Sequence, residues 1–236
     1  MKTIDNYIIE KLKIGKTYYT YQPKDRDELR KILEKRLAND KDADLNDIDV
    51  SKITDMGKDE DDNGLFDGLD PHNIDVSRWD VSGVENMSGL FIECKNLDCD
   101  LSNWDVSNVK NMWYMFCGCK KFKGKGLEYW DVSQVEDMGV MFFACDNLDC
   151  DLSNWDVSKV EDMLQMFYGC KKFNCDLSDW DVSNVKRMSH MFNGCKKFKG
   201  EGLENWDLTN VEKMSGIFLH CTSLKKIPKW YYSKMV

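Results

Sequence analysis

The stretch Trp104–Val109, with the sequence Trp-Asp-Val-Ser-Asn-Val, decides the architecture of this chain, because close copies of it recur almost to the C-terminus. The Trp-Asp pairs that mark the copies are spaced 25 or 26 residues apart and begin at Trp79, Trp104, Trp130, Trp155, Trp180 and Trp206. Such a regular period is typical of repeat proteins in which each unit buries its apolar face only against its neighbours. We therefore expect one elongated array of stacked coils.

The composition narrows the classes of partner. The 236 residues include 33 basic and 42 acidic side chains, for a formal charge of −9. A net acidic chain makes a poor general nucleic-acid binder, because counterion release requires a basic surface. No apolar run reaches the roughly 18 residues that a membrane-spanning helix needs. Asp5, Asn6 and Glu10 interrupt the N-terminal apolar residues, so we expect no secretion signal. From the charge and the lack of a long apolar run, we expect no nucleic-acid partner and no membrane insertion.

Six of the ten cysteines keep the repeat period and should form one column, with one thiol in each coil. In stacked coils such a column is typically a buried ladder of small apolar side chains. Parallel side chains in adjacent coils give poor disulfide geometry, so we predict reduced thiols, which favour a cytoplasmic location. No cysteine and histidine set has zinc spacing. The column consists of Cys94, Cys119, Cys145, Cys170, Cys195 and Cys221.

The chain divides into three parts. Residues 1–40 lack the repeat and predict a strand-helix cap, with a strand over Thr17–Tyr21 and a helix opened by Asp25. Leu29, Leu33 and Leu37 would lie on the helix face that covers the first coil. Residues 41–220 form the repeat array, and residues 221–236 form a C-terminal cap that includes Trp230.

Each coil can be divided by its pattern. Apolar alternation in Leu97–Leu101 predicts a short strand, and Asp105 closes a turn by accepting from the following backbone N–H groups. Ser107 has the position of an N-cap, and Val109 to Cys119 carry apolar residues about every three positions. We therefore predict an α/β array of about seven coils, each with one short strand and one short helical or 3-10 segment, capped at both ends.

The repeat consensus also resembles a known family. The pattern Met-Phe-x-x-Cys-x-x-Phe/Leu, followed by Asp-Leu-Ser-x-Trp-Asp-Val-Ser-x-Val-x-x-Met, is similar to the 25- to 26-residue repeats of bacterial BspA-like surface proteins and mycoplasma DUF285 proteins. The match covers about residues 45–227. The resemblance implies a right-handed leucine-rich-repeat-like solenoid without enzymatic activity. For some relatives it implies adhesion or surface exposure, so a cell-surface location stays open beside the cytoplasmic one.

Positions at which the copies disagree are the candidates for binding, because the coil places no structural demand on them. Stacked in register, six such residues would form an aromatic patch on the middle coils, and exposed apolar clusters commonly mark partner sites. The alternative is that several of them tuck between neighbouring segments. We predict a protein or glycan partner at Trp113, Tyr114, Phe143, Leu164, Tyr168 and His190.

An acidic insertion in the first coil suggests a calcium site. Its oxygen-bearing side chains are spaced like those of a calcium-binding loop, with Gly64 at the turn position. Pro71 blocks a regular exit helix, so a solvated acidic loop is the alternative. The candidate calcium ligands are Asp59, Asp61, Asn63 and Asp70, and we expect no other cofactor.

The sequence gives little sign of catalysis. Its only histidines are His72, His190 and His220, and it contains neither a nucleophile elbow nor a phosphate-binding glycine loop. We therefore predict a non-enzymatic interaction scaffold that recognises a protein or glycan through variable surface residues. The alternative is a calcium-stabilised structural or adhesion module that uses the loop from Asp59 to Asp70.

Overall fold

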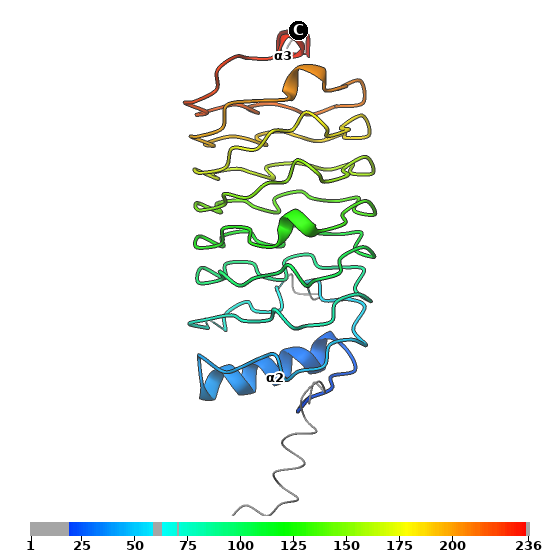
Figure 1. Cartoon of the computed structure of the whole chain (residues 1–236), viewed down its shortest axis with the longest axis vertical. Coiled ribbons are helices and arrows are strands. Elements are labelled where there is room, and N and C mark those ends of the chain that lie inside the picture. Colours follow the sequence, from blue (N-terminus) through cyan, green and yellow to red (C-terminus); the bar gives the residue numbers. More distant parts are fainter. Residues whose placement is uncertain (1–18, 59–62, 70, 235–236) are drawn as a thin grey trace, which may run out of the picture.

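The computed structural model describes residues 19–58, 63–69 and 71–234. Over this part the chain winds through a stack of similar coils, with α2 (Arg26–Asn39) at one end and α3 (Lys229–Lys234) at the other (Figure 1). Two 3-10 helices, η1 (Leu127–Tyr129) and η2 (Leu203–Asn205), lie within coils. None of the helices described has the length and apolarity needed to cross a bilayer. We call residues 45–69 the first coil and residues 202–224 the last coil.

Neighbouring coils are joined at one column of single parallel bridges, which runs through Asp55, Asn86, Asn111, Asp137, Asp162, Arg187 and Lys213. The strand predicted over Leu97–Leu101 is not formed. There the Leu101 N–H donates to the Lys125 carbonyl at 3.1 Å, but the Ser102 N–H turns back to Asp100 Oδ1 at 3.0 Å. The local Asp turn therefore takes the backbone donor that a longer ladder would use.

The segment predicted to be helical is a chain of β-turns instead. In Met112–Cys119, alternate N–H groups donate to carbonyls of the following coil at 2.8–3.0 Å. Between them, the N–H groups of Met115, Cys117 and Cys119 donate to the carbonyl three residues earlier, at 3.0–3.1 Å. The Trp113 N–H donates to Asn111 Oδ1 at 2.9 Å. A positive φ at Tyr114 (60°) and Gly118 (78°) provides the third turn residue that type II turns require. An α-helix would use all of these donors within the segment, so the coil stack replaces it.

The core is a set of stacked columns. Phenylalanines in successive coils, such as Phe116 and Phe142, stack with ring centroids 5.6 Å apart. Each tryptophan of the Trp-Asp pairs is buried, and its indole N–H donates to a carbonyl of the preceding coil, as from Trp155 to Leu127 at 2.8 Å. This bond satisfies a polar atom that would otherwise be costly to bury. Trp230 continues the column, because its ring stacks on Trp206 at 6.4 Å.

The column of periodic cysteines forms a thiol ladder inside the stack. Cys145 Sγ donates to the Phe116 carbonyl at 3.0 Å, and Cys119, Cys170 and Cys195 bond in the same way. Burial raises the pKa of these four thiols well above the ordinary value. A thiol with such a raised pKa is a poor nucleophile, so the ladder acts as packing.

The repeated aspartates close turns, as predicted. Asp105 Oδ1 accepts from the Ser107 N–H at 3.0 Å and from the Ser107 hydroxyl at 2.6 Å. Ser107 does not cap a helix as predicted, because the segment that follows it is not helical. At the equivalent position of the preceding coil, Glu85 lies three residues after Ser82 and pairs with Lys110 of the next coil at 2.7 Å.

The predicted helix after Asp25 is present and covers the first coil. Asp25 Oδ1 accepts from the Glu28 N–H at 2.9 Å, and Leu29, Leu33 and Leu37 are buried. Of the predicted Thr17–Tyr21 strand, the described part contributes one bridge, between Tyr21 and Ile48.

Candidate functional site

The predicted partner-binding residues all lie on one side of the stack, which we call the turn face. This face is formed by the β-turn segments, from Met112 to Cys119 in one coil and the equivalent residues in the others. Core positions there are filled by the repeated methionines, phenylalanines and cysteines. The remaining positions vary between coils, and some of them, such as Cys117 and Val140, are also buried. All six predicted side chains are half-buried, so each is part packing and part surface.

Trp113 and Tyr114 form the first aromatic pair. Their ring centroids are 4.1 Å apart, and the rings meet edge to face at 65°. Trp113 lies against the backbone of Gly139 in the following coil, where an added Cβ would come within 3.0 Å of the indole. Tyr114 holds a backbone conformation with φ of 60°, which is unfavourable for a bulky residue. The inter-coil hydrogen bond from its N–H to the Gly139 carbonyl holds it there.

Lys58 is a member of this site that the sequence did not identify. Its ammonium lies 4.7 Å from the centroid of the Trp113 ring and 4.6 Å from that of Tyr114, which is cation–π distance. To reach them its side chain passes over Gly89 in the coil between. The position of Lys58 in the repeat could have identified it, because Lys58 follows Met56 by two residues, as Tyr114 follows Met112. The acidic insertion directly after Lys58 obscured it.

Phe143 and Tyr168 form a second aromatic pair. Their rings are stacked face to face at 4.7 Å, with an angle of 11° between the planes. Among the residues described, no ring contact joins this pair to Trp113 and Tyr114. Among the aromatic residues of the predicted patch, the rings therefore form two separate pairs, spread over three successive coils.

Leu164 and His190 occupy the same face without joining a ring pair. Leu164 lies in the same coil as Tyr168 and is half-buried. His190 lies within 3.2 Å of the Asn193 amide and packs on Gly216 of the last coil. The structure therefore places His190 on the turn face but uses much of its ring for packing.

A concave region beside the bridge column is mainly acidic. It is lined by residues of four coils, including Glu136, Asp137, Glu161 and Asp162. Burial and the nearby Asp162 carboxylate raise the pKa of Asp137, while Arg187 pairs with Asp162. In the part of the chain that is described, no cluster of three or more histidine, cysteine or acidic side chains is arranged to hold a metal ion.

The predicted calcium ligands Asp59, Asp61 and Asp70 lie outside the described residues. Of the four, only Asn63 is described, and its main-chain carbonyl accepts from Arg26 at 2.7 Å. Arg30 donates to the Leu65 carbonyl at 2.8 Å, so two guanidinium groups lie where the loop returns to the first coil.

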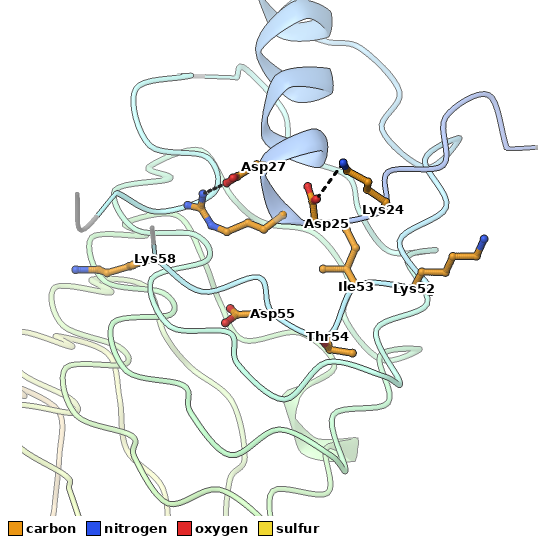
Figure 2. A pocket seen from close by; sticks show the side chains of 9 residues that line it. Lys24, Asp25, Asp27, Lys52, Ile53, Thr54, Asp55 and Lys58 are labelled. Carbon is orange, nitrogen blue, oxygen red and sulfur yellow. Dashed lines mark ion pairs between the residues drawn. The ribbon is translucent and has the colours of Figure 1, made fainter. Parts of the chain in front are cut away.

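A cleft separates the start of α2 from the first coil (Figure 2). Its charged side chains largely pair with one another, as Lys24 does with Asp25 and Arg26 with Asp27, each at 3.8 Å. Figure 2 shows Lys52 directed away from these pairs. Arg26 also donates to the Gly57 carbonyl, so we assign the cleft to the joint between cap and coils.

Comparison with known proteins places the chain in a family. The model of DUF285, described as a Mycoplasma protein of unknown function, matches residues 28–147 and 119–231. The chain therefore belongs to the DUF285 family. No curated protein and no solved structure gave a significant match.

Proposed function

We propose that this chain is a non-enzymatic interaction scaffold that binds a partner protein through its turn face. We further propose that the stack of coils is a right-handed leucine-rich-repeat-like solenoid of the BspA-like type. The observation that carries the proposal is the pair of aromatic clusters, Trp113 with Tyr114 and Phe143 with Tyr168, half-exposed on three successive coils. Aromatic residues are enriched among those that dominate binding energy at interfaces.

The arrangement of the rings favours a protein over a glycan. Sugars stack on open faces of aromatic rings, but Phe143 and Tyr168 cover each other and Lys58 covers part of the Trp113 and Tyr114 rings. Partly covered rings of this kind can still pack edge to face against apolar and aromatic side chains of a protein partner.

The calcium-stabilised module stays a prediction from the sequence. Nothing in the described residues favours it. The guanidinium groups of Arg26 and Arg30, which bond to the carbonyls at the end of the loop, place positive charge beside the proposed cation.

A double substitution tests the proposed turn-face site. Trp113→Ala with Tyr168→Ala removes one ring from each pair, and we expect it to lose partner proteins that the original chain captures from a lysate of the native host. The matched control is Tyr129→Ala, because Tyr129 is 72% exposed and lies on η1, outside the turn-face segments. Thermal melting of both variants establishes that they remain folded.

The outcome that refutes the proposal is a folded double variant that retains the same captured proteins as the Tyr129→Ala control. Binding of immobilised glycans by the original chain, lost only in the double variant, would replace the protein partner with a glycan.

A further inference from the structure

The last coil ends the stack with a row of backbone donors. On the turn face each interior coil donates alternate N–H groups to the coil that follows. The coil before the last does so from Met188, His190, Phe192 and Gly194 to carbonyls of the last coil at 2.8–3.0 Å. The equivalent donors in the last coil are the N–H groups of Met214, Gly216, Phe218 and His220. In the described part of the chain these four N–H groups have no acceptor.

The C-terminal cap covers a different part of the last coil. Trp230 continues the tryptophan column and donates to the Leu203 carbonyl at 2.6 Å. The Phe218 ring packs against Trp230 and Tyr231, while Leu219 remains 47% exposed and His220 is exposed. The cap therefore closes the tryptophan side and leaves the donor row beside an exposed apolar side chain.

A second copy of this chain does not fit the donor row. Its matching surface would be the carbonyl edge of the first coil, but α2 already fills that edge. Arg26 donates to the Gly57 carbonyl and Arg30 to the Leu65 carbonyl, which are the positions equivalent to Trp113 and Met115. Stacking two copies end to end would require displacement of α2, so the occupant must bring free carbonyl groups.

We propose that the four N–H groups of Met214, Gly216, Phe218 and His220 bind the main-chain carbonyls of a peptide segment of a partner protein that follows the β-turn path of a coil. Within the stack, donors at alternate residues meet carbonyls at alternate residues of the next β-turn segment, so such a peptide would continue the ladder as an added strand continues a sheet edge. Exposed Lys213 lies at the start of the row and fits an acidic side chain of the peptide, and Leu219 fits an apolar one. This site is separate from the aromatic pairs of the turn face.

The chain itself supplies the probe for a test. A synthetic peptide with the sequence of residues 160–169 carries the carbonyls of Asp162, Leu164, Met166 and Tyr168. Within the stack these carbonyls accept four N–H groups of the preceding coil at 2.7–3.0 Å. Next to its first residue, Val160, the peptide carries an acidic pair, Glu161 and Asp162, that can meet Lys213.

Residue-resolved hydrogen exchange of the whole chain with this peptide reads out the site. We expect exchange at Met214, Gly216, Phe218 and His220 to slow by about tenfold or more, with no change at the alternate residues Ser215 and Leu219. The peptide with reversed sequence order should protect none of them. Protection that is absent, or equal for both peptides, overturns the proposal. Protection that grows with protein concentration without peptide also overturns it, because a second copy would then be the occupant.

Two variants separate this site from others. Lys213→Glu should weaken protection by the peptide severalfold, whereas Lys172→Glu, an exposed lysine in another column, should leave it unchanged. The Trp113→Ala and Tyr168→Ala double variant should also keep full protection. If the double variant loses the protection, the peptide binds at the aromatic pairs and the donor-row proposal is wrong.

Discussion

The two ends of the stack present opposite backbone groups on the turn face, and only at one end do side chains bond to them. The first coil presents carbonyls on the turn face, and the guanidinium groups of Arg26 and Arg30 bond to them from α2. The last coil presents N–H groups for which no described residue provides a hydrogen-bond acceptor. The difference follows from the direction of the turn-face ladder, in which every coil donates toward the C-terminus. An array of this kind therefore needs a cap rich in donors at one end and a cap or partner rich in acceptors at the other.

The largest effect is expected at the carbonyl end. Arg26→Met with Arg30→Met keeps most of the apolar stems but leaves the Gly57 and Leu65 carbonyls without their donors. Loss of these charge-assisted bonds should lower the free energy of unfolding by about 2–4 kcal/mol, measured by urea denaturation. The control is Lys35→Met on the exposed side of α2. If the double variant matches that control, the arginines do not cap the stack.

The tryptophan column allows the C-terminal end to be compared with the interior. Trp155→Phe removes the indole N–H that bonds to the Leu127 carbonyl inside the stack, and we expect a loss of about 2 kcal/mol. Trp230→Phe removes the equivalent bond at the end, where the ring is half-buried, and should cost about 1 kcal/mol because water can replace it. Urea midpoints of both variants measure the difference. Equal losses would show that the last coil is as closed as the interior.

The smallest effect concerns the interior, where neither kind of end cap is needed. Burial, and then the neighbouring Asp162, raise the pKa of Asp137 above 3.8, so the folded chain binds that proton more tightly than the unfolded chain does. The stability contributed by this proton is present below the unfolded pKa and is lost as the pH rises through the folded pKa. Asparagine already occupies this column at Asn86 and Asn111. Asp137→Asn should therefore stabilise the chain at pH 7 by about 0.5 kcal/mol, allowing for solvent screening.

Urea denaturation at pH 7 and pH 3 checks the sign, because the advantage of Asp137→Asn should vanish at pH 3. Asp105→Asn is the opposite control. Hydrogen bonds from the Ser107 side chain and backbone lower the pKa of Asp105, so the stability it contributes is present above the unfolded pKa and lost as the pH falls. A loss of stability for Asp137→Asn at pH 7 would contradict the assignment.

The sequence predicted the features that depend on groups within a few residues better than those that depend on a neighbouring coil. The turn at Asp105 and the helix after Asp25 are present as predicted, because each depends on groups within a few residues. The helical segment was wrong because a step of about three residues suits both a helix and a chain of β-turns. Glycines such as Gly118 occupy a recurring position with positive φ and were the overlooked signal for β-turns.

The candidate site shows the same division. Register alone placed Trp113, Tyr114, Phe143 and Tyr168 on one face, since equivalent positions of successive coils must stack. How the rings pair, and that Lys58 covers the first pair, depends on contacts between side chains in different coils. The spacing of a repeat carries no information about such contacts.

By itself, the sequence determined the period, the core columns and the local turns, because a pattern repeated every 25 or 26 residues forces like residues to stack. Only the tertiary structure decided where the backbone N–H groups of the turn segments go. Each can donate within its own segment or to the next coil, and the neighbouring carbonyls settle that choice. The same choice gives the stack its direction. At one end it leaves carbonyls that accept from arginine side chains, and at the other it leaves four N–H groups without an acceptor among the described residues.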